Sequence, residues 1–285
     1  MKKIVIVAAM ALNSVISMAQ VDRAANPIGA VFARQSGETP EGTFRFASDG
    51  YEVFTIASSD KAYQPASLYY GENNVDKAKV DALAPDAKVP TAMNCFVVRT
   101  TEGYIMFDTG LPESRDGKTV ARLASLNIAP AEINAIYVTH SHFDHIGGLL
   151  DDDGRAVYSK ATLYIPAEEL TFMRETMKEA CQKIENAYRG RIVTFQWGEI
   201  LPNNVLPIAA KGHTPGHTAY QLGSLLFVGD LMHGPSIQLI DPTINASYDA
   251  NSPQSVATRT TILSYAAARS LTLLGAHIPL NGLLF

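Results

Sequence analysis

The sequence contains only two cysteines, Cys95 and Cys181, among its 285 residues. Neither has the spacing of a zinc or redox motif, so the sequence does not predict a thiolate metal site. Cys95 lies in an apolar, strand-like run and Cys181 on an amphipathic helical pattern. We therefore expect two separate buried thiols. A single disulfide stays open as an alternative, because an exported chain would meet an oxidising compartment.

The chain also lacks a long run of Lys or Arg, and its formal net charge is −5. A mildly acidic chain of this kind is a poor candidate for nucleic-acid binding. Hydrophobic residues make up 47% of the sequence and charged residues 18%, which is typical of a globular protein with one large core. After the N-terminus no segment is apolar enough to span a bilayer, so we expect no membrane span in the mature form.

The N-terminus has the pattern of a bacterial export signal. Lys2 and Lys3 form a short positive region, and residues 4–16 form an apolar stretch too short to cross a bilayer. A small-residue cleavage site follows at 17–19, so Gln20 is the expected first mature residue. The sequence thus predicts a signal peptide at 1–19 and a periplasmic or secreted protein.

The remainder is expected to hold an N-terminal arm at 20–50 and one domain at 51–285. Neither an internal repeat nor a linker long enough to divide the chain is present. Apolar periodicity and turn residues predict strands at 51–57, 94–100, 104–107, 135–139, 160–165, 192–195, 205–209, 219–222, 225–228 and 271–275. The same signals predict helices at 75–84, 118–126, 167–189 and 253–269. Early hairpins followed by helices between strands indicate a single α/β sandwich.

All seven histidines lie between positions 140 and 277, and three of them fall in one six-residue run. The run is His140-Ser141-His142-Phe143-Asp144-His145, and an apolar strand ends just before it. Burying so many titratable groups together without a cation would be costly. In a tight loop His140 and His142 can face one cation, while Asp144 and His145 face a second. Imidazole and carboxylate are ordinary zinc ligands, so the run predicts a metal site.

Three later elements repeat this placement of ligands at strand ends. The sequence Gly-His-Thr-Pro-Gly-His at 212–217 forms a loop between strands. Asp230 follows the strand at 225–228, and His277 follows the strand at 271–275. Sites in α/β proteins are commonly built at the carboxyl ends of strands, so we expect these residues to meet.

These motifs, in this order and spacing along residues 91–277, resemble the metallo-β-lactamase superfamily. The sequences around 90–94, 107–110, 229–233 and 275–279 look like its methyl parathion hydrolase and periplasmic lactonase-like branch. The resemblance implies an αββα sandwich with the metal site at one edge of the sheets. It also implies two divalent metal ions, with zinc preferred. One ion would be held by His140, His142 and His217, the other by Asp144, His145 and His277, and Asp230 would bridge them.

Such a ligand set predicts a metal-dependent hydrolase of ester, lactone or phosphotriester bonds. Two divalent ions can share a hydroxide near neutral pH, because metal binding lowers the pKa of water to about 7. Asp144 can in addition take a proton from the nucleophile or pass one to the leaving group. No serine or cysteine nucleophile is needed, and Ser141 is interpreted as filler in the loop. The expected partner is a small-molecule substrate, and a homodimer is one expectation for the assembly.

Several residues near these motifs have two open interpretations. Asp108 either accepts from a ligand imidazole or is a turn residue at a strand end. His213 is interpreted as structural rather than as a ligand, since His217 fits the pattern better. His233 either lines the pocket and donates to Asp230 or packs as a core residue, and Tyr248 is a candidate pocket wall.

Other activities are less consistent with the motifs. The His-rich β-lactamases of the superfamily lack an Asp at the place of Asp230, which disfavours β-lactam hydrolysis, and an export signal disfavours a cytosolic thioester substrate. A non-catalytic or decayed metal-binding homologue is the remaining alternative. Only eight residues follow His277, whereas the resemblance implies a further strand. We therefore expect a truncated C-terminus, lower stability or weaker occupancy of the second metal.

Overall fold

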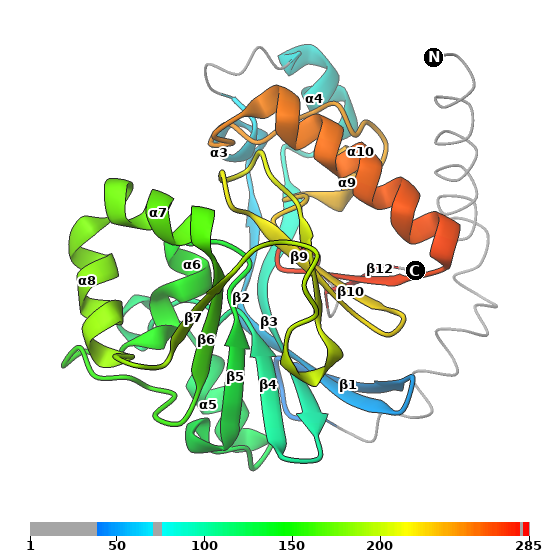
Figure 1. Cartoon of the computed structure of the whole chain (residues 1–285). Coiled ribbons are helices and arrows are strands. Elements are labelled where there is room, and N and C mark those ends of the chain that lie inside the picture. The colour runs from blue at the N-terminus through cyan, green and yellow to red at the C-terminus, as the bar shows by residue number, and fades with distance from the viewer. Residues whose placement is uncertain (1–38, 71–75, 280–281, 285) are drawn as a thin grey trace.

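The computed structural model describes residues 39–70, 76–279 and 282–284 (Figure 1). The expected signal peptide, its cleavage site and most of the expected arm lie outside these ranges. Within them, no helix has both the length and the apolar character needed to cross a membrane.

Two β-sheets form the centre of the protein. The larger sheet has the strand order β1-β2-β3-β4-β5-β6-β7, and the smaller has the order β12-β11-β10-β9-β8. The strands of the larger sheet are β1 (Thr43–Ser48), β2 (Tyr51–Tyr63), β3 (Val89–Thr100), β4 (Gly103–Phe107), β5 (Ile133–Tyr137), β6 (Thr162–Pro166) and β7 (Ile192–Phe195). Those of the smaller are β8 (Leu206–Ala209), β9 (Thr218–Leu222), β10 (Leu225–Gly229), β11 (Thr272–Gly275) and β12 (Leu283–Leu284).

Helices cover the outer face of each sheet, which completes the expected αββα sandwich (Figure 1). They are α3 (Pro65–Leu68), α4 (Lys77–Leu83), α5 (Thr119–Ser125), α6 (Phe143–Ile146), α7 (Ala167–Thr176), α8 (Lys178–Ala187), α9 (Pro235–Gln238) and α10 (Ser252–Arg269). Helices α5, α7 and α8 pack on the larger sheet, and α10 packs on the smaller one. The short helices α3, α4 and α9 share a separate apolar cluster.

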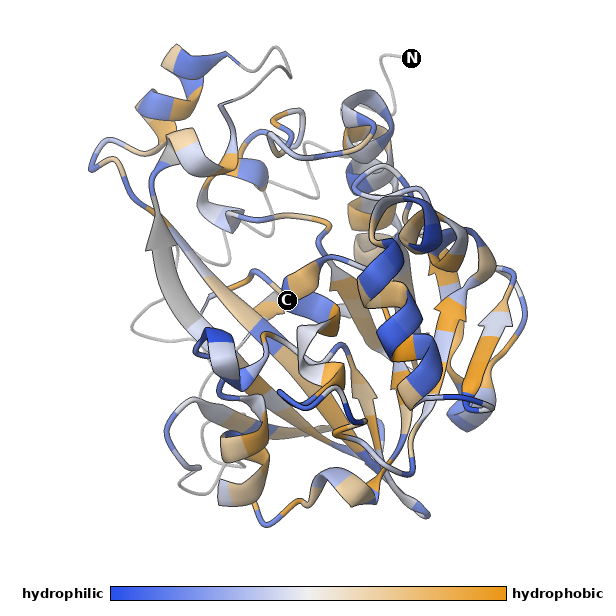
Figure 2. Cartoon of the chain, turned by 90° about the vertical axis from the view of Figure 1, so that its left-hand side faces the viewer, coloured by the Kyte–Doolittle hydropathy of each residue, from blue (hydrophilic) through white to orange (hydrophobic). Residues whose placement is uncertain are grey.

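The layer between the sheets is rich in aromatic side chains. Phe107 on β4 stacks on Phe227 of β10 with ring centroids 3.7 Å apart, and Tyr137 on β5 stacks on Phe107 at 5.3 Å. Alternate side chains of each strand enter this layer, and the others pack under the helices. In Figure 2 the strands are mostly orange, and blue concentrates on the helix surfaces. This aromatic layer fixes one sheet against the other, and therefore fixes the strand ends that carry the polar motifs.

Both cysteines are buried and free, as expected, and both pack in the apolar cluster under α5, α7 and α8. Two other features differ from the sequence-based expectation. The larger sheet begins at Thr43 with β1, inside the range assigned to the arm, because Phe46 enters the inter-sheet core. The helix expected at 167–189 is two helices, since Met177 leaves helical geometry (φ −132°, ψ 46°). Near this kink, the Thr176 hydroxyl donates to the carbonyl of Phe172, a contact that tends to bend helices.

The segment around His277 is held by β3 and by the last strand. Asn94 is buried, and its amide donates to the carbonyls of Gly275, Ala276 and Ile278 at 3.4, 3.1 and 2.8 Å. Strand β12 pairs with β11, so the sheet does not end at β11 as the short tail led us to expect. Asn94 therefore couples β3 of the larger sheet to the end of β11 in the smaller sheet.

We expect Asn94→Ala to lower the free energy of unfolding by about 1–3 kcal/mol, because the carbonyl of Ile278 would lose its donor and those of Gly275 and Ala276 would keep only a backbone donor. Urea denaturation followed by circular dichroism measures this difference. Asn186→Ala, at an exposed position on α8, is the matched control and should have a much smaller effect. Equal stability of the two variants would contradict the structural role given to Asn94.

Candidate metal centre

The polar motifs converge where strands of both sheets end. Asp108 follows β4, and the run from His140 to His145 follows β5 and continues into α6. From the smaller sheet, Asp230 follows β10, His277 follows β11 and the 212–217 loop joins β8 to β9. Because the inter-sheet core fixes these strand ends, residues more than 130 positions apart in the sequence lie within contact distance.

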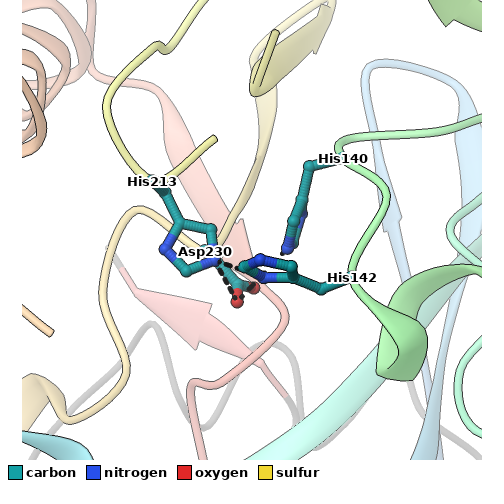
Figure 3. A group of neighbouring side chains, drawn as sticks. All are labelled: His140, His142, His213 and Asp230. Atoms are coloured by element: carbon teal, nitrogen blue, oxygen red, sulfur yellow. Dashed lines mark hydrogen bonds and ion pairs between the residues drawn. The ribbon is translucent and has the colours of Figure 1, made fainter. Parts of the chain in front are cut away.

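One group of possible ligands consists of His140, His142, His213 and Asp230 (Figure 3). Their ligand atoms all lie within 4.8 Å of one another. Nε2 of His213 is 2.9 Å from Nδ1 of His142 and 3.3 Å from Oδ2 of Asp230. Three imidazoles and one carboxylate thus surround a common point, as a tetrahedrally coordinated cation would require.

A second group consists of Asp144, His145 and His277. Nε2 of His277 lies 3.5 Å from Oδ2 of Asp144, and Nε2 of His145 lies 3.9 Å from the same oxygen. Asp230 also faces this group, since its Oδ1 is 2.9 Å from His145 Nε2 and its Oδ2 is 3.1 Å from His277 Nε2. Asp230 thus lies between the two groups, in the position expected of a shared ligand.

Buried polar atoms without a hydrogen-bond partner provide a test of whether these residues fit metal ions. Nε2 of His140, Nε2 of His145 and Oδ1 of Asp230 are buried and make no hydrogen bond. Buried polar atoms without a partner are rare and need an explanation. Nitrogen and oxygen donors aimed at one another without hydrogen-bond geometry are explained by cations between them. The residues therefore fit two divalent cations, and zinc accepts such a donor set.

Outer contacts fix the orientation of three of these imidazoles. Asp108 Oδ2 faces Nδ1 of His145 at 2.8 Å, and Asp249 Oδ1 faces Nδ1 of His213 at 2.7 Å. The carbonyl of Ala92 accepts from Nδ1 of His277 at 2.6 Å. In each case the acceptor holds the proton on Nδ1 and leaves Nε2 directed toward the cluster.

Of the two interpretations of Asp108, the structure confirms the contact with a ligand imidazole. The same carboxylate accepts from the backbone N–H and the hydroxyl of Thr139, at 2.8 and 2.7 Å. Asp249 was not identified from the sequence, because it lies in an irregular loop where neither periodicity nor a motif marks it.

The structure brings His213, rather than the expected His217, into the first group of possible ligands. Its Nδ1 donates to the carbonyl of Ala210 at 2.8 Å, and its Nε2 accepts from the backbone N–H of Asp230 at 3.0 Å. Both ring nitrogens are therefore occupied by backbone groups, and His217 belongs to none of the ligand groups found in the part of the chain that the structure describes. His213, four residues earlier in the same loop, lies in the first ligand group where His217 was expected.

Burial and charge shift the proton affinities of these side chains in opposite directions. Burial lowers the pKa of His142 to about 3 and holds that of His140 well below its usual value. Burial would also lower the pKa of His213, but hydrogen bonds to Asp230 and Asp249 outweigh it and raise the pKa to about 9. The surrounding imidazoles outweigh the burial of Asp230 and hold the pKa of its carboxyl well below the usual range.

Two more side chains adjoin the cluster. Nε2 of His233 is 3.0 Å from Oδ2 of Asp230, and the His233 ring stacks against His277 with centroids 4.9 Å apart. Tyr248 packs edge-on against His233 and His213 at 5.0 and 5.9 Å, and 43% of its surface is exposed. Of the two interpretations of His233, the contact with Asp230 is the observed one. Tyr248 packs beside the cluster through its contacts with the rings of His213 and His233.

The part of the chain that carries these motifs also matches a known protein family. The sequence model of the Metallo-beta-lactamase superfamily matches residues 90–277. The N-acyl homoserine lactonase of Bacillus thuringiensis is 26% identical over 194 residues, which cover 57% of this chain and 74% of the relative. A hydroxyacylglutathione hydrolase of Yersinia pestis (strain Pestoides F) is 34% identical over 116 residues, or 41% of this chain and 40% of that enzyme.

Two solved structures share the fold. The dizinc quorum-quenching lactonase AidC, in complex with a product N-hexnoyl-L-homoserine, has a TM-score of 0.75 at 23% identity. The alignment covers 87% of this chain and 93% of AidC. The hydrolase AbOPH has a TM-score of 0.76 at 22% identity, with 86% and 93% of the two chains covered. At these identities the likeness shows the fold, and it agrees with the αββα arrangement.

The contrast between the two histidines of the 212–217 loop can be tested directly. We expect His213→Ala to lose about one of two bound zinc equivalents, because the first group would keep only two imidazoles. His217→Ala removes no ligand and should retain both equivalents. Elemental analysis after desalting measures the difference, and the opposite pattern would identify His217, not His213, as the ligand.

Metal binding by the metal-free protein should release protons at pH 7.5. His213, with a pKa of about 9, carries a proton there that a cation must displace. Affinity for zinc should accordingly rise with pH and level off above about 9. Calorimetric titrations in buffers with different ionisation enthalpies count the released protons. Heats that do not depend on the buffer at pH 7.5 would contradict this electrostatic description.

Proposed function

The chain belongs to the metallo-beta-lactamase superfamily, and from this premise we propose that it is a dinuclear metal enzyme that opens lactone rings. It is a metal-dependent hydrolase of lactone or ester bonds. The lactone class is proposed because relatives that the chain matches over 74% of their length are N-acyl homoserine lactonases.

The observation that carries the proposal is the pair of ligand groups that share Asp230. We assign His140, His142 and His213 to one cation and Asp144, His145 and His277 to the other, with Asp230 between them. Two divalent cations held by these residues would supply a hydroxide nucleophile near neutral pH and would stabilise negative charge on the substrate oxygens.

Asp144 is suited to proton transfer within this arrangement. Its side chain is 35% exposed, whereas Asp230 is 2% exposed, so Asp144 is the carboxylate of the site that a substrate can reach. Burial would raise the pKa of Asp144, but the charges of His145 and His277 outweigh it and lower the pKa. An ionised carboxylate beside both water and substrate can accept the nucleophile's proton and return it to the leaving oxygen.

Two exposed aromatic side chains favour a substrate with an apolar part. Phe143, between two of the proposed ligands in the sequence, is 43% exposed, and Tyr248 is exposed to the same degree. Large apolar side chains exposed beside a polar site are typical of ligand-binding surfaces. A lactone with an acyl chain presents both an electrophilic carbonyl and an apolar tail. Phosphotriesters, which the sequence motifs also suggested, are the second substrate class to be tested.

The decisive measurement is hydrolysis of N-acyl homoserine lactones, aryl esters, phosphotriesters and β-lactams by the zinc-loaded enzyme. We expect lactone turnover that a chelator abolishes and added zinc restores. Asp144→Asn should lower kcat by about 100-fold or more, because the amide cannot accept the proton. Asp152→Asn, at an exposed turn later in the sequence, is the control and should leave kcat unchanged.

Metal content should be measured for each variant, so that lost proton transfer is distinguished from lost zinc. Turnover that persists in chelator, or an absence of turnover on all four substrate classes, would overturn the proposal.

A further inference from the structure

Glu169, in the first turn of α7, is a carboxylate that the proposed reaction does not use. It has 0% exposure, and its neighbours on the same helix, Leu170 and Met173, pack in the apolar core. A buried carboxylate is costly unless its oxygens are fully satisfied by donors. Its partners therefore indicate what the carboxylate stabilises.

Each oxygen of Glu169 accepts two hydrogen bonds from a different loop. Oε1 accepts from the backbone N–H and the hydroxyl of Ser141, at 2.8 and 2.6 Å. Oε2 accepts from the hydroxyl of Thr214 and the backbone N–H of Gly216, at 2.8 and 2.9 Å. Four short bonds to one charged group join the two loops through a single side chain.

These two loops carry the three histidines of the first ligand group. Ser141 lies between His140 and His142, and Thr214 directly follows His213. The interpretation of Ser141 as filler is therefore wrong, since it makes two of the four bonds to Glu169. Where the loops meet, His142 Nδ1 lies 2.9 Å from His213 Nε2.

The close approach of the second loop to α7 depends on Gly216. A Cβ at Gly216 would collide with the backbone nitrogen and side chain of Glu169. Gly216 thus lets its own N–H reach Oε2, and the loop is seated directly on the first turn of α7.

The second ligand group is fixed by other contacts. The carbonyl of His145 accepts from the backbone N–H and hydroxyl of Thr109, at 2.8 and 3.0 Å, and its ring is oriented by Asp108. His277 is held by Ala92 and by the Asn94 contacts. Loosening the bonds to Glu169 should therefore affect one group and leave the other in place.

We propose that Glu169 is a positioning residue that sets the distance between the His140–His142 loop and the His213 loop, and so the metal affinity of the first group alone. This inference rests on the proposed function, in which that group holds one of two cations. Glu169 acts through Ser141, Thr214 and Gly216 and need not touch the cation.

Glu169→Gln tests the proposal, because one amide oxygen can satisfy one loop while the amide NH2 faces the donors of the other. Zinc affinity is measured by competition with a chromophoric chelator in two single-site backgrounds. His277→Ala leaves the first group complete, and His142→Ala leaves the second. We expect Glu169→Gln to weaken zinc binding about 10–100-fold in the His277→Ala background and to leave it unchanged in the His142→Ala background. The visible spectrum of cobalt(II) in the His277→Ala background should change as well.

Glu168→Gln is the matched control, because Glu168 adjoins Glu169 but pairs with Lys211 on the surface. It should leave zinc affinity unchanged in both backgrounds. Equal weakening of the two groups by Glu169→Gln, or no weakening, would overturn the proposal. If Glu169→Gln does not fold, Ser141→Ala removes one of the four donors and should give a smaller loss confined to the first group. Failure of the unsubstituted protein to bind two zinc ions would instead refute the proposed function.

Discussion

The structure depends most on the burial of Asp230 among imidazoles. Its carboxylate lies within 3.7 Å of nitrogens from five histidines, and its side chain is 2% exposed. Such a cluster could not keep all of its groups charged or all of them neutral without leaving buried donors or acceptors unmatched. One cation held by each of the two groups would resolve this conflict. The constraint explains why unsatisfied atoms occur on His140, His145 and Asp230 themselves.

Carboxylates outside the cluster connect its histidine-bearing segments to the surrounding helices, strands and loops. Asp108 links the end of β4 to Thr139 and His145, and Asp249 connects the loop before α10 to His213. Glu169 links α7 to the loops of both sheets. Each of these carboxylates is buried and accepts from at least two groups, so each restricts where a histidine-bearing segment can lie. The site is therefore held by helices and strands on both sides of the sandwich.

The aromatic layer between the sheets also helps to position the site, because it fixes one sheet relative to the other. Stacking of Phe107 on Phe227 aligns the ends of β4 and β10, and Tyr220 on β9 donates its hydroxyl to the carbonyl of Val138, just before the His140 run. The same residues thus contribute both to the stability of the fold and to the geometry of the site. A change in this layer would alter the separation of Asp230 from the His140–His145 run, because those segments begin where the stacked strands end.

The sequence by itself determined the class of fold, most of the strands and six of the seven proposed ligands. These follow from local patterns: apolar periodicity, a His-x-His-x-Asp-His run after a strand, and single ligands after two further strands. Only the tertiary structure places His213, rather than His217, in the first group of possible ligands, since both lie in one Gly- and Pro-containing loop without periodicity. The choice depends on distant acceptors: Asp249 receives the Nδ1 proton of His213, while Ala210 and Asp230 occupy both nitrogens of His217. The role of Glu169 was hidden for the same reason, because hydrogen bonds between segments 28 to 47 residues apart have no signature in the local sequence.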